Sequence, residues 1–233
     1  MTEECKLFDF LKSLNPVSVF IPFGTCCLPA KMIENVQLRR FSLPMDWLFT
    51  TNSMLAHCID DDFETFLDKA NYSFIPLEER PWGEKFSFCH HSFYKENHYA
   101  HYVFNHFNPL EDSTYETLKR RTNRLINTFR SSQNKVFFNF SHGSTSEEGF
   151  ISLHNAIKRK YENFSLIMIS YKGISTNFEL VENVKFLDQS CFFEFHSFSK
   201  FIGERFHSEI DNSFIKSLFS WIKKGDDFNH LKE

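Results

Sequence analysis

The sequence predicts a three-layer α/β fold, in which a mainly parallel β-sheet is covered by helices on both faces. Two observations predict this fold. An apolar strand, a tight glycine turn and a helix follow one another directly between Val17 and Val36. From Lys135 onward, short apolar strands alternate with longer segments of helical periodicity, as in a parallel sheet with crossover helices. Because the chain has no internal repeat, low-complexity tract or linker, residues 1–233 are expected to form a single domain.

The first strand and the first helix are the clearest elements. Residues Val17–Phe23 are apolar, β-branched and aromatic, which is typical of a buried strand. Gly24 then breaks the strand. A helix is expected from Cys27 to Val36, because Pro29 suits a first helical turn and apolar residues follow at helical spacing.

The remaining elements follow in chain order, interrupted by one irregular stretch. Thr51 offers a cap for a short helix, and the three-four spacing of apolar residues predicts a long helix from Ser113 to Arg130. Residues Asn71–Pro109 are rich in aromatic residues and histidine and show no clear period. The other expected helices cover Met54–Cys58, Asp60–Leu67, Ser146–Tyr161 and Ile210–Lys223, and the expected strands cover Lys135–Phe140, Ser165–Ser170, Val184–Leu187 and Phe192–Phe195.

Composition and charge argue against several classes of protein. Hydrophobic residues make up 42% and charged residues 24% of the chain, which argues against disordered and fibrous proteins. The net charge of −4 and the pI of about 6.3 argue against a nucleic-acid partner. No run approaches the roughly 18 apolar residues of a membrane span, and no signal peptide is evident, so we expect a cytoplasmic protein. The 31 phenylalanines indicate a Phe-rich core.

Cys27 is the candidate nucleophile. The six cysteines include no Cys-x-x-Cys pair and no spacing of a disulfide framework, so most are expected to be reduced thiols. Cys27 lies where the first helix begins, and the dipole and free N–H groups of a first helical turn favour a thiolate. Ligands of an open α/β sheet bind beyond the carboxyl ends of its strands. The candidate site regions are therefore the turn before Cys27, the loop at 141–145 and the turn after Ser170.

A thiol nucleophile needs an imidazole partner that takes up its proton and protonates the leaving group. Six histidines are candidates for this role, five of them within one stretch: His90, His91, His98, His101, His106 and His142. Their positions alone do not single out one of them. The group Cys89, His90 and His91, with His98 and His101, matches no common zinc spacing, so neither a metal nor a cofactor is expected.

Four segments carry a resemblance to a known family: Val19–Ala30, Phe41–Leu48, Phe88–Phe93 and Tyr115–Phe129. They contain a strand leading into Gly-x-x-Cys-x-x-Ala, a Pro-x-Asp-Trp segment, and a histidine followed closely by phenylalanine. This pattern resembles a bacterial and viral family of unknown function whose members are proposed papain-like cysteine peptidases. The resemblance runs from about Val17 to Ser170.

The resemblance implies roles for three residues. Cys27 corresponds to the cysteine of the motif and would be the nucleophile. His91 would be its base, and Asp46 would orient the imidazole or shape the pocket. The sequence departs from the family at Pro22 and Phe23, where Ser-Leu is more usual, and this change affects the turn before the cysteine.

The architecture implied by the word papain differs from the one that the residues predict. Papain-type folds combine a cysteine-bearing helix with an antiparallel barrel, whereas the alternation after Lys135 predicts a parallel sheet. We take the alternation as the guide to the fold, because cysteine–histidine pairs recur on unrelated folds.

Three functions are compatible with the sequence. The first is a cysteine-dependent hydrolase, a papain-like peptidase or amidase, whose substrate is a peptide or an acylated small molecule or glycan. The second is an acyl- or glycosyl-type transferase of glycan modification with a coenzyme A or nucleotide-sugar donor. The phosphates of that donor would meet a group of basic residues on one helix: Lys119, Arg120, Arg121 and Arg124. The third is a non-catalytic interaction module with an apolar partner surface. The oligomeric state stays open.

Overall fold

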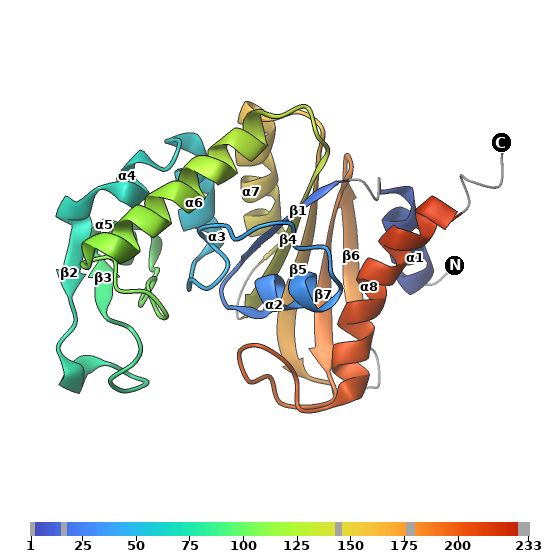
Figure 1. The fold of residues 1–233 in the computed structure, drawn as a ribbon. Helices are drawn as coiled ribbons and strands as arrows, with labels where there is room; N and C mark the ends of the chain where they lie inside the picture. The colour runs from blue at the N-terminus through green and yellow to red at the C-terminus, as the bar shows by residue number, and fades with distance from the viewer. Residues whose placement is uncertain (1–2, 15–17, 143–145, 176–179, 228–233) are drawn as a thin grey trace.

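The structure, a computed structural model, describes residues 3–14, 18–142, 146–175 and 180–227. Its main sheet has five strands in the order β1-β4-β5-β7-β6. The strands are β1 (Val19–Gly24), β4 (Lys135–His142), β5 (Phe164–Ile174), β7 (Ser190–Ser197) and β6 (Val181–Leu187). The first four in this order are parallel, and β6 pairs antiparallel to β7 at the edge (Figure 1). The mainly parallel sheet predicted from the alternation is confirmed.

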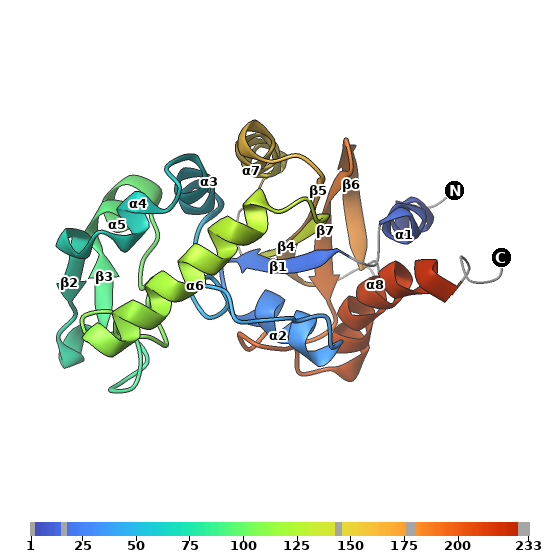
Figure 2. The same cartoon turned by 45° about the horizontal axis from the view of Figure 1, so that its top comes forward.

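Helices cover both faces of the sheet. One face packs against α2 (Leu28–Asn35) and α8 (Glu209–Asp227), with α1 (Glu3–Ser13) beside α8. The other face packs against α3 (Asn52–Asp60), α7 (Glu147–Lys160) and the end of α6 (Asp112–Arg130) (Figure 2). Side chains of β1 alternate between the two layers, because Phe20 packs on Phe219 of α8 while Phe23 packs on the opposite side. The predicted three-layer fold is therefore confirmed.

A smaller lobe extends from the sheet at the far end of α6 (Figure 1). It contains a two-stranded antiparallel sheet, β2 (Tyr72–Phe74) with β3 (Cys89–His91). The helices α4 (Glu64–Leu67) and α5 (Ser92–His98) and two short 3₁₀ turns, Lys69–Asn71 and Leu77–Glu79, complete it. Between residues 71 and 109, strands of three residues and a helix of seven are too short to show a period, so the sequence of this stretch is irregular.

Most predicted elements occur within a few residues of the expected bounds. Thr51 caps α3 as expected, since its hydroxyl oxygen accepts a hydrogen bond from the N–H of Met54 at 3.2 Å. Helix α4 is shorter than predicted, because Phe63 adopts a left-handed conformation with φ 65° and delays the start to Glu64. Helix α1 was not predicted. In the described part of the chain, no helix combines the length and the apolar character needed to cross a membrane.

Gly24 shapes the turn that leads to Cys27. Its φ is +141°, and a Cβ at this position would lie 2.3 Å from the carbonyl oxygen of Phe140 on β4. The next residue ties the turn to the same strand, because the N–H of Thr25 donates to Phe140 at 3.1 Å and its hydroxyl accepts from the N–H of His142 at 2.8 Å. Glycine therefore allows the close approach of β1 and β4 that fixes the start of α2.

Candidate active site

Cys27 occupies the N-cap position of α2 and contacts a histidine. Its sulfur lies 3.4 Å from Nε2 of His106. The neighbouring Cys26 differs, because it packs into the apolar core shared by α2 and α8, and its sulfur accepts a hydrogen bond from the N–H of Leu28. Of the two adjacent thiols, Cys27 is thus the one that is paired with an imidazole.

Asn105 and Ser87 hold the imidazole of His106 in place. The amide nitrogen of Asn105 lies 3.3 Å from the same Nε2 atom that faces the sulfur. The amide oxygen accepts from the Ser87 hydroxyl at 2.9 Å, and the N–H of Ser87 donates to the Asn105 carbonyl at 2.9 Å. The ring of Phe86 packs edge-on against the imidazole. Because an amide nitrogen can only donate, this contact favours the tautomer with the ring proton on Nδ1 and with Nε2 as an acceptor.

The pair lines a cavity of about 630 Å³. The cavity lies beyond the carboxyl ends of β1 and β4, where the sequence placed it, and His142 also lines it. Aromatic side chains form one wall, and residues between β7 and α8 contribute another: Phe49, Trp82 and Phe86 on the first, Phe201, Ile202, Gly203, Glu204 and Arg205 on the second. The turn after Ser170 is absent from the described lining, since β5 continues to Ile174, and residues 143–145 of the predicted loop lie outside the described residues.

Burial keeps both partners neutral. Desolvation raises the pKa of the Cys27 thiol to about 12, and the charge of Glu204 adds to the rise. Desolvation also lowers the pKa of His106 below its ordinary value of 6.5, against the opposing charge of Glu204. The sequence predicts a thiolate, but Cys27 is instead a thiol in contact with an imidazole. The reason is that Cys27 is only 3% exposed, and the dipole of the eight-residue helix α2 does not compensate for the pKa rise that desolvation causes.

His91, the base implied by the resemblance, lies in the smaller lobe and not beside Cys27. It is 0% exposed and stacks on the ring of Phe66. Its Nε2 lies 3.1 Å from the carbonyl oxygen of Thr65, and its Nδ1 has no hydrogen-bond partner. Burial lowers its pKa to about 4. The pairing of Cys27 with His91 does not occur in this structure, and His91 is part of the packed core of the lobe.

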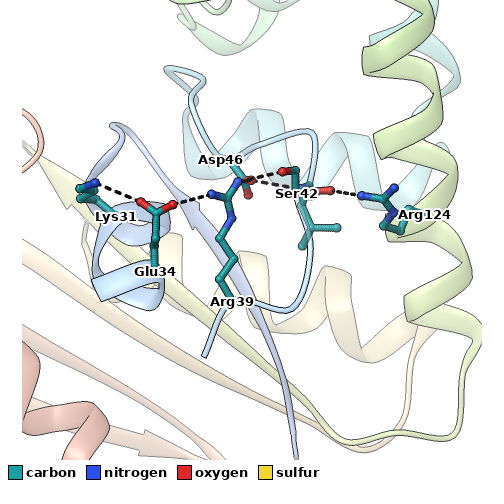
Figure 3. Close-up of polar contacts among 7 residues, drawn as sticks. Lys31, Glu34, Arg39, Ser42, Asp46 and Arg124 are labelled. Carbon is teal, nitrogen blue, oxygen red and sulfur yellow. Dashed lines mark hydrogen bonds and ion pairs between the residues drawn. The ribbon is translucent and has the colours of Figure 1, made fainter. Parts of the chain in front are cut away.

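Asp46 lies in a separate ion-pair network (Figure 3). Its carboxylate is 1% exposed, pairs with Arg39 and accepts a hydrogen bond from the N–H of Leu43 at 3.0 Å. Burial raises the pKa of Asp46, and the Leu43 N–H and the Arg39 charge oppose that rise. Arg39 also pairs with Glu34 of α2 at 3.2 Å. These contacts position the segment between α2 and α3, and none of them involves His106.

The basic residues of α6 lie apart from the cavity. Arg124 donates to the carbonyl oxygen of Ser42 at 2.8 Å, and Arg121 packs over the ring of Phe107. Lys119 is exposed, as is Arg120. None of the four is among the described residues that line the cavity around Cys27, so the predicted phosphate contact has no structural support there.

A second constellation resembles a serine triad, but its serine and histidine are buried. His154 of α7 lies 3.1 Å from the Ser190 hydroxyl and 3.2 Å from the Asp188 carboxylate. Ser190 is 0% exposed, and its oxygen accepts the N–H of Leu166 at 2.9 Å. This group connects α7 to the β6–β7 turn, and its serine hydroxyl is closed to a substrate. In the parts of the chain that the structure describes, His, Cys, Asp and Glu form no group of three or more that could hold a metal ion.

Comparison with known proteins identifies the family. Residues 18–173, about two thirds of the chain, match the family model described as "Putative papain-like cysteine peptidase (DUF1796)". The chain belongs to this family. No curated protein and no solved structure matches the chain. The part matched to this papain-like peptidase family contains Cys27, Asn105 and His106, whereas the cavity wall between β7 and α8 lies outside it.

The sequence did not single out His106, because it lies 79 residues from Cys27 and shares its stretch with four other histidines. A weak signal was available in the adjacent Asn105, since an amide next to a histidine can fix the ring. Sequence spacing does not show which histidine the fold brings to the carboxyl edge of the sheet.

Proposed function

We propose that this protein is a cysteine-dependent hydrolase that cleaves an amide or ester bond, peptides included, through Cys27 and His106. The observation that carries the proposal is the 3.4 Å contact between the sulfur and Nε2, made within a cavity of about 630 Å³. A thiol and an imidazole at this distance form the nucleophile and base of acyl transfer.

The neutral state of the pair determines the order of events. As the sulfur attacks the substrate carbonyl carbon, the thiol proton moves to Nε2 of His106. The tetrahedral intermediate then collapses, the bond to the leaving amine or alcohol breaks, and His106 returns the proton to that leaving group. Water hydrolyses the resulting thioester with His106 again as base, which regenerates the thiol and releases the carboxylic acid.

Asn105 and α2 support this chemistry. The Asn105 amide keeps Nε2 in the acceptor state that proton uptake requires. The positive end of the α2 dipole lies next to the nucleophile and stabilises negative charge on the carbonyl oxygen in the tetrahedral state. Asp46, which the resemblance places near the imidazole, contributes through the position of the segment before α3.

Alkylation kinetics test the neutral pair. Cys5 is exposed, so the measurement uses a Cys5→Ser background in which Cys27 adducts are followed by peptide mass spectrometry. With His106 as base, the alkylation rate of Cys27 by iodoacetamide rises as His106 loses its proton, below pH 6.5, and then reaches a plateau. In the His106→Ala protein the rate depends on the thiolate alone and rises about tenfold per pH unit across the neutral range.

The matched control is His142→Ala, which removes another imidazole that lines the same cavity and should retain the plateau. Identical log-linear profiles in the parent and the His106→Ala protein would show that His106 does not act on the thiol.

A further inference from the structure

The segment between β7 and α8 is firmly anchored beside the cavity. The Asp211 carboxylate, which is 0% exposed, accepts hydrogen bonds from the N–H of Phe198 at 2.8 Å and the hydroxyl of Ser199 at 2.6 Å. Asn212 accepts the N–H of Phe206 at 2.9 Å. Figure 1 shows this segment in orange-red, between the end of β7 and the start of α8. Two buried side chains of α8 therefore fix both ends of the segment.

The tip of the segment is a tight turn that lines the cavity. Phe201 and Phe206 form an antiparallel bridge, and the N–H of Ile202 donates to the carbonyl oxygen of Arg205 at 2.9 Å. Phe201 packs on the rings of Phe140 and His142 at the ends of the sheet. The turn from Ile202 to Arg205 is thus held in a defined position at the cavity.

Glu204 brings a negative charge to the reacting pair. It is exposed and lines the same cavity as Cys27 and His106. Its charge adds to the rise of the Cys27 pKa and opposes the fall of the His106 pKa, both of which are caused mainly by desolvation. Arg205 lines the same cavity with the opposite charge. Binding a cation beside Glu204 would neutralise this charge.

The wall formed by Phe49, Trp82 and Phe86 suits the apolar part of a ligand. Trp82 is 50% exposed and packs edge-to-face on Phe49 at a centroid distance of 5.3 Å. Aromatic faces combined with one carboxylate favour a ligand with an apolar body and a positively charged group, because both the rings and the carboxylate attract a cation.

We infer that Glu204 is a specificity-determining residue, and that the site selects substrates bearing an amine or guanidinium group next to an apolar or aromatic group. The inference rests on the proposed function, because it treats the bound molecule as a substrate. It concerns a feature of this chain beyond residues 18–173, which match the family model.

Binding of three matched small molecules tests the inference without any reaction. Phenethylamine, phenethyl alcohol and hydrocinnamate share a phenyl ring and differ in charge, and their affinities for the wild-type protein are measured by isothermal titration calorimetry at neutral pH. Phenethylamine is expected to bind about tenfold more tightly than the neutral alcohol, and hydrocinnamate more weakly than either. In Glu204→Gln the preference for the amine is lost, while the alcohol binds as before.

The control is Glu162→Gln, which should leave all three affinities unchanged. Glu162 is an exposed carboxylate just before β5, at the amino ends of the parallel strands and therefore at the end of the sheet opposite to the cavity. Equal binding of the amine and the alcohol, or a preference for hydrocinnamate, would overturn the inference. A charge preference without Cys27 reactivity would contradict only the proposed function, and reactivity without a charge preference would contradict only the role of Glu204.

Discussion

Replacing His106 by alanine is expected to slow the acylation of Cys27 by para-nitrophenyl phenylacetate by a factor on the order of 10²–10⁴, the usual contribution of a general base. The ester supplies a phenyl group for the aromatic wall of the cavity, and its release of nitrophenolate is followed by absorbance in stopped flow. His106 is exposed and its partners stay in place, so the variant is expected to unfold at nearly the same denaturant concentration as the wild type.

His91→Ala is the matched control for that experiment. This substitution leaves a cavity beneath Phe66 and leaves the Thr65 carbonyl without its donor, which costs about 2–4 kcal/mol of unfolding free energy. The folded fraction should still acylate at the wild-type rate. The opposite outcome, with acylation lost in His91→Ala and kept in His106→Ala, would restore the pairing that the sequence suggested.

Gly24→Ala is expected to produce the largest loss of stability, about 3–5 kcal/mol, because it combines an unfavourable backbone conformation with a steric clash. The added Cβ would lie 2.3 Å from the Phe140 carbonyl oxygen at a φ of +141°. Relief of this clash requires β1 and β4 to separate at the point where Thr25 bonds to β4. Urea denaturation followed by circular dichroism measures the effect.

Gly173→Ala separates the two contributions. Gly173 has a φ of +111° and no atom within 4 Å of an added Cβ, so its substitution carries only the conformational cost of about 1–2 kcal/mol. Equal losses in the two variants would show that the close approach of β1 to β4 is not what requires glycine at position 24.

Local sequence patterns were sufficient to predict the mainly parallel sheet and the helix that begins at Cys27. The apolar run of β1, the glycine turn and the first-turn proline of α2 are neighbours in sequence, so they located Cys27 at the start of a helix. The strand and helix periods after Lys135 predicted the parallel sheet for the same reason.

The partners of Cys27 depend on tertiary contacts that no local pattern encodes. His106 follows a lobe of short elements, and its orientation is set by Asn105 and Ser87, which are themselves 18 residues apart. His91 matched the family pattern in sequence, yet its position in β3 buries it against Phe66. Glu204 lies on a turn whose position is set by side chains of α8.

The description papain-like does not fit the architecture of this chain. A parallel sheet with Cys27 after its first strand differs from a helix packed on an antiparallel barrel. The same pair of functional groups can be built on either scaffold, because the reaction depends on the distance between thiol and imidazole and on access to them.

We propose above all that Cys27 forms an acyl-thioester with His106 as the base. The most direct test mixes the Cys5→Ser protein with para-nitrophenyl phenylacetate, quenches with acid within the first turnover and maps the adduct by peptide mass spectrometry. We expect one phenylacetyl group on the peptide that contains Cys27, absent in Cys27→Ala and strongly reduced in His106→Ala. The proposal would be contradicted if Cys27 stayed unmodified in the protein that keeps His106, and if the ester were consumed no faster than in buffer without protein.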